Sequence, residues 1–96
     1  MSAYMIFIRD RLRDEAAMAE YSARAGASTA GHPVEPLVFY GAVETLEGST
    51  ADGVVVIRFP DKAAALAWYD SPEYTDARKF RHLGADYRVV IVEGIG

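Results

Sequence analysis

The chain has 96 residues, of which 51% are apolar and 25% are charged, and it contains no cysteine. This composition is typical of one folded domain with a hydrophobic core and excludes a disordered segment. The formal net charge of −4 argues against a nucleic-acid partner, because phosphate binding normally requires a basic surface. Without cysteine there are no disulfides, thiolate nucleophiles or thiolate metal sites.

No segment has the features of a targeting or membrane-spanning sequence. The apolar run near the N-terminus, residues 3–8, is too short to cross a bilayer. It also lacks the basic leader and the small-residue cleavage site of a signal peptide. We therefore expect a cytoplasmic protein with no membrane partner.

The first third of the chain predicts a strand followed by a helix. Tyr4–Ile8 is apolar at successive positions, which indicates a strand whose two faces are both covered. Apolar residues then recur at the spacing of an amphipathic helix: Ala17, Met18, Tyr21 and Ala25. Asp10 or Asp14 is the expected N-cap, and Gly26 followed by Gly31-His32-Pro33 is expected to close the helix.

The middle of the chain predicts a β-hairpin. Leu37–Leu46 is rich in strand formers, and Gly41 within it indicates a bulge or a close backbone approach. Glu47–Gly53 is a polar turn that leads into a second strand over Val54–Phe59. That strand must end at Pro60, because proline has no amide hydrogen for the strand ladder.

The last third predicts two capped helix starts and a final strand. Asp61 is placed to cap an alanine-rich helix over Lys62–Tyr69. Ser71-Pro72-Glu73 repeats this pattern with a hydroxyl N-cap, a proline at the first helical position and an acid in the first turn. Gly84 is expected to end this helix, and Tyr87–Val92 supplies a fourth strand that is again apolar on both faces.

The order of elements is β-α-β-β-α-β with a split second helix, and residues 1–96 form one domain. This order predicts an α+β, ferredoxin-like fold, in which helices cover one face of a four-stranded antiparallel sheet. A single copy would leave the second, apolar sheet face exposed, and exposed faces of that size are normally interfaces. We therefore expect a homodimer whose two sheets enclose a barrel, with any pocket inside that barrel or at its mouth.

Several stretches resemble one known family, the domain-of-unknown-function family 1330. They are Leu46-Glu47-Gly48, Arg58-Phe59-Pro60, Ala67-Trp68-Tyr69-Asp70-Ser71-Pro72-Glu73-Tyr74, Arg81 and Val92-Glu93-Gly94. That family is similar to the dimeric α/β barrel superfamily, which includes small monooxygenases, isomerases, haem-handling enzymes and proteins without an established activity. The resemblance therefore implies a fold and a dimer, and does not specify a reaction.

His32 and Tyr40 are the candidate proton-transfer residues. An imidazole beside Glu35 could act as an acid, a base or a metal ligand. The alternative is an exposed loop histidine, because one imidazole and one acid do not make a metal site. We expect no metal.

Arg58 is a charged residue within an apolar strand. If Val55 and Ile57 face the helices, strand alternation directs Arg58 to the opposite sheet face. There it requires a carboxylate, supplied either by Glu44 or Glu47 of the neighbouring strand or by an anionic ligand.

A polar and aromatic cluster around the second capped helix is the other candidate ligand site. Its members are Tyr69, Asp70, Ser71 and Tyr74, and Arg78 and Arg81 follow at helical spacing from Tyr74. They could line the rim of a pocket, or Tyr74 could pack in the core while the arginines reach solvent or acids. No phosphate loop, dinucleotide fingerprint, HExxH or other cofactor motif is present, so no cofactor is predicted.

Two functions fit these observations. One is a small enzyme that acts on a hydrophobic or aromatic carboxylate in the dimer barrel, where Arg58 or Arg81 binds the anion and His32 or Tyr40 handles a proton. The other is a non-catalytic dimeric module that binds a small metabolite or only assembles. Converging arginine, histidine and tyrosine side chains around a cavity would favour the enzyme.

Overall fold

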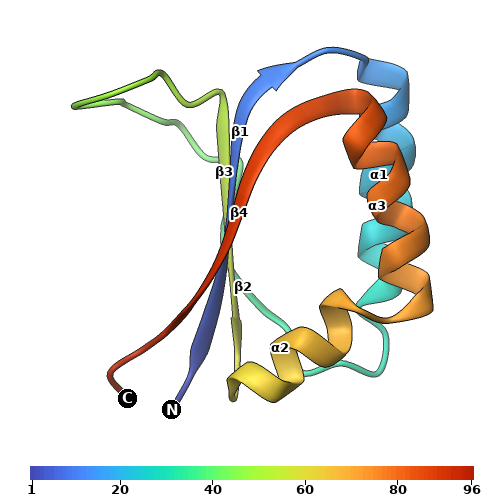
Figure 1. Cartoon of the computed structure of the whole chain (residues 1–96), viewed down its shortest axis with the longest axis vertical. Coiled ribbons are helices and arrows are strands. Elements are labelled where there is room, and N and C mark those ends of the chain that lie inside the picture. Colours follow the sequence, from blue (N-terminus) through green and yellow to red (C-terminus); the bar gives the residue numbers. More distant parts are fainter.

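The computed structural model describes residues 1–96 as one layer of helices on one sheet (Figure 1). The elements are β1 (Ala3–Leu12), α1 (Glu15–Ser28), β2 (Glu35–Phe39), β3 (Gly53–Phe59), α2 (Lys62–Tyr69), α3 (Pro72–Gly84) and β4 (Ala85–Glu93). The sheet is antiparallel in the order β2-β3-β1-β4. This arrangement confirms the ferredoxin-like prediction. None of the three helices has both the length and the apolar character needed to cross a membrane.

Strand alternation divides the side chains of the sheet between two faces. On β1 and β3, the buried residues Met5, Phe7, Val55 and Ile57 point toward the helices and form the core with Trp68. The large side chains of Phe59 and Tyr74 are also fully buried. Apolar burial of this size supplies most of the free energy that holds the helices on the sheet.

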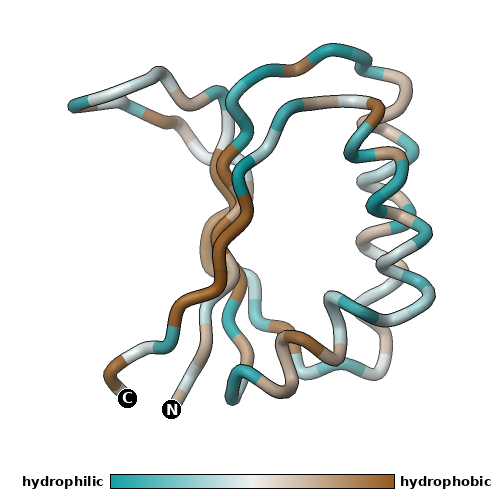
Figure 2. The backbone as a smooth tube through the Cα atoms, in the orientation of Figure 1, coloured by the Kyte–Doolittle hydropathy of each residue, from teal (hydrophilic) through white to brown (hydrophobic).

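The opposite sheet face is apolar at its centre and open in the single chain. The register aligns Val38, Val56, Ile6 and Val90 in one row across all four strands. Figure 2 shows this apolar character along the central strands. Ion pairs stand toward the two ends of the face: Arg58 with Glu35, and Arg88 with Asp10. The prediction that Val54, Val56 and Arg58 share this face is confirmed by the burial pattern of β3.

The predicted strand over Leu37–Leu46 is wrong in its limits. The strand β2 spans Glu35–Phe39, and residues 40–52 form an irregular segment that projects away on the side of the sheet opposite the helices (Figure 1). The irregularity in the ladder lies between Pro36 and Val38, not at Gly41. The left-handed φ of 53° at Tyr40 turns the chain out of the sheet, which ends the pairing that strand propensity alone had extended.

The first helix begins and ends close to the predicted positions. Asp14 is its N-cap, and the carboxylate accepts hydrogen bonds from the amides of Ala16 and Ala17. The helix continues through Gly26 to Ser28, so Gly26 does not terminate it. Gly31, with a φ of 81°, makes the turn that follows.

The joint between α2 and α3 is held by the predicted caps. Asp61 caps α2 through the amide of Ala64, at 2.7 Å. The Ser71 hydroxyl accepts a hydrogen bond from the amide of Tyr74 at 3.2 Å and donates one to the carbonyl of Trp68 at 2.7 Å. One buried hydroxyl therefore satisfies the start of α3 and the end of α2 together.

Replacement of Ser71 by alanine should lower the free energy of unfolding by about 1 kcal/mol, because the buried amide of Tyr74 loses its partner, while the carbonyl of Trp68 still accepts from the backbone amide of residue 71. Urea denaturation at equilibrium measures this change. Ser49→Ala, in the exposed irregular segment, is the matched control and should change the midpoint very little. An equal midpoint for Ser71→Ala and wild type would contradict the capping role.

Candidate functional site

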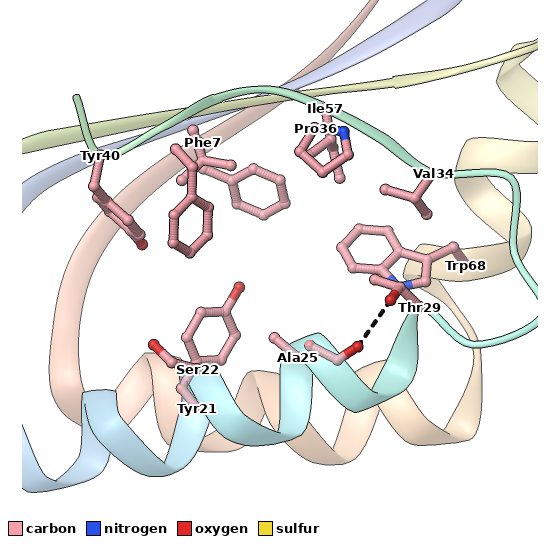
Figure 3. A pocket seen from close by; sticks show the side chains of 13 residues that line it. Phe7, Tyr21, Ser22, Ala25, Thr29, Val34, Pro36, Tyr40, Ile57 and Trp68 are labelled. Atoms are coloured by element: carbon pink, nitrogen blue, oxygen red, sulfur yellow. Dashed lines mark hydrogen bonds between the residues drawn. The ribbon is translucent and has the colours of Figure 1, made fainter.

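A cavity of about 230 Å³ lies between α1 and the β2–β3 side of the sheet. Figure 3 shows side chains that project into it from both walls. It is lined by thirteen residues: Phe7, Tyr21, Ser22, Ala25, Gly26, Thr29, Val34, Pro36, Phe39, Tyr40, Val55, Ile57 and Trp68. It thus lies on the helix-covered face of the sheet, within one chain. A pocket inside the barrel between two sheets, as expected from the sequence, stays a prediction.

The cavity exists because the face of α1 above it carries small residues. Ser22, Ala25, Gly26 and Thr29 follow one another at helical spacing and do not fill the space over the sheet. Val55 and Ile57 form an apolar floor below them. Such a mainly apolar hollow with few polar groups is the usual form of a site for a small molecule.

Trp68 closes one end of the cavity and is fixed there on several sides. Its indole Nε1 donates a hydrogen bond to the hydroxyl of Ser28 at 3.1 Å. Its ring lies 4.0 Å from that of Tyr74 and 5.7 Å from that of Phe59, measured between centroids. This end of the cavity is therefore rigid and apolar.

Tyr40 closes the other end of the cavity, because its side chain extends across the strands on the helix-covered face of the sheet. Its ring lies directly over Gly53, where a Cβ atom would be 2.7 Å from the ring carbon Cδ1. The ring then meets the guanidinium of Arg9 on β1 at 5.0 Å from the centroid. Its hydroxyl is hydrogen-bonded to that of Tyr87 on β4. Tyr40 thus spans from β2 to β4, and only glycine at position 53 leaves room for this path.

Arg81 lies behind the cavity wall as a buried cation without an anion. The residue is 4% exposed, and its Nε is buried without a hydrogen-bond partner. None of the seven ion pairs in the protein involves it. Its guanidinium carbon is 5.2 Å from the ring centroid of Tyr87 and 5.9 Å from that of Phe7. These contacts with aromatic faces replace only part of the hydration that burial removes.

A second tyrosine pair lies on the helix side of Arg81. The hydroxyls of Tyr21 on α1 and Tyr74 on α3 are 2.8 Å apart. Burial is the main cause that raises the pKa of both tyrosines, and it also raises the pKa of Tyr87. All three phenols therefore remain protonated at neutral pH and can donate hydrogen bonds.

The surroundings of Arg81 offer donors and no acidic acceptor. The guanidinium carries five N–H donors, and each hydroxyl pair keeps one hydrogen that its own bond does not use. The pKa of the neighbouring His82 is lowered, first by burial and then by the positive charges of Arg81 and Arg78. An anion is the chemical complement of such an environment.

The structure brings only part of the predicted site together. Tyr40 lines the cavity, while Arg81 and Tyr74 contact lining side chains from behind. Tyr69 and Arg78 are outside the lining, and the guanidinium of Arg78 stacks on the ring of Tyr69 at 4.3 Å from its centroid. His32 is in the turn after α1 and is also not among the lining residues.

The expected partners of Arg58 are corrected by the strand register. Arg58 pairs with Glu35, at 3.6 Å, and its Nε donates to the hydroxyl of Ser2 at 3.0 Å. Glu44 and Glu47 are in the irregular segment and do not pair with it, because β2 begins at Glu35, directly opposite Arg58. Arg58 is on the open face and so does not reach the cavity.

Sequence reasoning missed three residues of this site: Tyr21, Tyr87 and Trp68. Tyr21 and Tyr87 were assigned to a helix face and a strand from their spacing, which gives no sign of a shared neighbour. One signal in the sequence could have pointed to these residues. The chain has six tyrosines in 96 residues, and the helix that packs on the sheet carries arginines, which together favour contacts between buried phenols and guanidinium groups. The described residues contain no group of three or more histidines and acids that could hold a metal ion.

The family model described as "Domain of unknown function (DUF1330)" matches residues 2–95. The chain belongs to this family. No curated protein matches the chain. Membership in DUF1330 confirms the resemblance seen in the sequence and assigns no activity.

Solved structures share the fold at low sequence identity. A protein of unknown function from Rhodopseudomonas palustris has a TM-score of 0.71 at 18% identity, over 99% of this chain and 83% of its own. A dimeric ferredoxin-like protein of unknown function from Thermobifida fusca has a TM-score of 0.67 at 19% identity, over 98% and 92%. SnoaB from Streptomyces nogalater, a cofactor-independent oxygenase, has a TM-score of 0.68 at 10% identity, over 99% and 94%. At these identities the likeness extends to the fold alone.

The buried tyrosine pair predicts a loss of stability in alkali. Because the folded state raises the pKa of Tyr21 and Tyr74, their contribution is fully present below the unfolded value of about 10 and is lost as the pH rises above it. Each group adds a slope of up to about 1.4 kcal/mol per pH unit. Tyr21→Phe should therefore show a shallower decline than wild type above about pH 10, measured by urea unfolding at several pH values. Identical slopes would contradict the burial of this phenol.

Proposed function

We propose that this DUF1330 protein is a homodimer that binds a small hydrophobic or aromatic carboxylate in the cavity beneath α1, with Arg81 as the positive partner of the carboxylate. The observation that carries this proposal is Arg81, a residue that is 4% exposed, whose Nε is buried without a hydrogen-bond partner and which takes part in no ion pair. A buried charge without a partner costs several kcal/mol, so its presence calls for an acceptor supplied from outside.

The shape and lining of the cavity support the apolar part of the ligand. Phe7, Val55, Ile57 and Trp68 present apolar surface, and a volume of about 230 Å³ suits a ligand with one ring or a short branched chain. Phe7 and Tyr21 line the cavity and also adjoin Arg81. A ligand that lies on the floor with its carboxylate toward these two side chains places its charge on the side of the cavity behind which Arg81 lies, although Arg81 is not itself a lining residue.

Binding is better supported than acid–base catalysis. The thirteen lining residues include no carboxylate and no imidazole, and His32 is not among them. The pKa of Tyr87, which contacts Tyr40, is raised by burial, so Tyr87 holds its proton at neutral pH. The lining therefore offers no base to remove a proton from a bound ligand, which favours a binding module over an enzyme that depends on His32 and Tyr40.

The open sheet face supports the dimer. Ile6, Val56 and Val90 lie side by side at its centre, and the Arg58–Glu35 and Arg88–Asp10 ion pairs lie toward its ends. An apolar centre with a polar rim is the usual arrangement of a protein interface. The ferredoxin-like protein from Thermobifida fusca is described as dimeric, which agrees with this role for the face. The occupant that we propose is a second copy of the same sheet.

The Arg81→Met variant should lose carboxylate binding and become more stable. Methionine keeps the length of the aliphatic stem and removes a buried, unpaired charge, so the free energy of unfolding should rise by about 1–2 kcal/mol. Isothermal titration measures the affinity for benzoate, phenylacetate and 3-phenylpropionate, with the amide of each acid as the uncharged comparison. Urea unfolding measures the stability.

Arg78→Met on the same helix is the matched control, since Arg78 stacks on Tyr69 outside the cavity. It should leave the affinity for the carboxylates unchanged. Wild-type protein that binds none of the three acids, or an Arg81→Met variant that binds them as well as wild type does, would refute the carboxylate site.

Val56→Lys should convert the proposed dimer into a monomer. The residue lies in the central row of the open face, where a lysine from each copy would place two charges in an apolar interface. Light scattering at micromolar concentration reports the mass. Leu83→Lys, at a position on α3 that is 62% exposed, should leave the mass unchanged. A monomeric wild type would overturn the sheet-to-sheet interface.

A further inference from the structure

We propose that the hydroxyls of Tyr40 and Tyr87 form the second half of the anion site, so that the ligand carboxylate binds Arg81 and this hydroxyl pair together. This inference rests on the proposed function and adds two binding residues to it. Tyr87 connects the two halves, since its ring adjoins the guanidinium of Arg81 and its hydroxyl contacts that of Tyr40. Tyr40 in turn lines the cavity, where a ligand would lie.

The hydrogen-bond inventory leaves this pair with a free donor. When one hydroxyl donates to another, the accepting hydroxyl still has its own hydrogen for a third group. The two cations near the pair, Arg9 against the ring of Tyr40 and Arg81 against the ring of Tyr87, can only donate. Asp52 accepts from Nε of Arg9 at 3.0 Å, and the only hydrogen bond of the two tyrosine hydroxyls is the one between them. The free hydroxyl hydrogen therefore lacks an acidic acceptor, as the guanidinium of Arg81 does.

A carboxylate satisfies both halves because it has two oxygens. One oxygen can accept from the guanidinium while the other accepts from the hydroxyl pair. The raised pKa of Tyr87 keeps its hydroxyl protonated at neutral pH, so it donates to an anion and does not repel it. An amide of the same shape offers only one acceptor oxygen and no charge. The site should therefore discriminate between an acid and its amide.

The backbone of Tyr40 fixes the position of its hydroxyl. A φ of 53° is unusual for a residue with a bulky side chain and costs free energy that the surroundings must offset. This conformation is the one that lays the ring over Gly53 and directs it toward Tyr87. Strained residues of this kind gather at binding sites, because strain can hold a side chain in its binding orientation.

A purely structural role is the alternative, in which the tyrosine pair only closes the end of the sheet. The two roles differ in what the loss of a hydroxyl changes. If the pair binds the carboxylate, removal of either hydroxyl should weaken the acid and leave the amide unaffected. If the pair only closes the cavity, the acid and the amide should change by the same factor.

The test uses Tyr40→Phe and Tyr87→Phe in the full-length protein, with isothermal titration of phenylacetate and of phenylacetamide. We expect each variant to bind phenylacetate about tenfold more weakly than wild type, as for the loss of one hydrogen bond to a charged group, and to bind the amide equally well. Tyr69→Phe is the control, because Tyr69 is outside the cavity lining. It should change neither affinity.

Gly53→Ala tests the positioning without touching any hydroxyl. Its Cβ would meet Cδ1 of Tyr40 at 2.7 Å and so displace the ring. This variant should show the same loss of acid-over-amide selectivity as Tyr40→Phe, with thermal unfolding confirming that it folds. If the Gly53→Ala variant does not fold, the acid-over-amide selectivity of Tyr40→Phe and Tyr87→Phe alone decides whether the hydroxyl pair binds the carboxylate.

The outcomes separate this inference from the proposed function. Wild type that fails to bind phenylacetate and the other acids would refute the carboxylate site, and with it this extension. Binding that depends on Arg81 but has an unchanged acid-to-amide ratio in Tyr40→Phe and Tyr87→Phe would refute the second half of the site alone. A selective loss in both variants supports it.

Discussion

The burial of one positive charge, on Arg81, is the constraint around which the interior of this protein is arranged. A guanidinium that is largely removed from water without a carboxylate is stabilised either by polarisable aromatic faces or by an external anion. The structure provides the faces of Phe7 and Tyr87 and offers no carboxylate. A core designed only for stability would place an apolar side chain at this position of α3. This cost in stability, which the remaining core must offset, is what supports the proposal that Arg81 belongs to a binding site.

The fold could be predicted from the sequence because its signals are local. Asp61 and Ser71 cap the helices that their positions indicate, and Pro60 stands just after the last residue of β3. The alternation of β3 placed Arg58 on the correct face. The limits of β2 could not be predicted in this way, since Val43 and Thr45 have strand propensity and yet lie in the irregular segment. A left-handed turn at Tyr40 decides that boundary, and no propensity of tyrosine indicates it.

The cavity could not be predicted because it depends on small residues, which leave space unfilled, as much as on the large side chains that line it. Small residues on one face of α1 look in sequence like an ordinary helix surface, and their meaning appears only when β2 and β3 lie below them. Arg81 was identified as a candidate from its spacing after Tyr74, but its lack of a partner is a property of the folded core. The pairing of Tyr40 with Tyr87, which are 47 residues apart, requires the register of three strands.

The same strands serve the cavity and the open face, which connects the two proposed roles. On β3, Val55 and Ile57 form the cavity floor, while Val54 and Val56 between them face the other way. A shift of register by one residue would exchange the two sets of side chains, so the pairing of β3 with β1 must stay fixed for both. A second sheet packed on the open face would restrain that pairing from outside. Dimer formation would then hold the floor of the cavity rigid, although each cavity is built within a single chain.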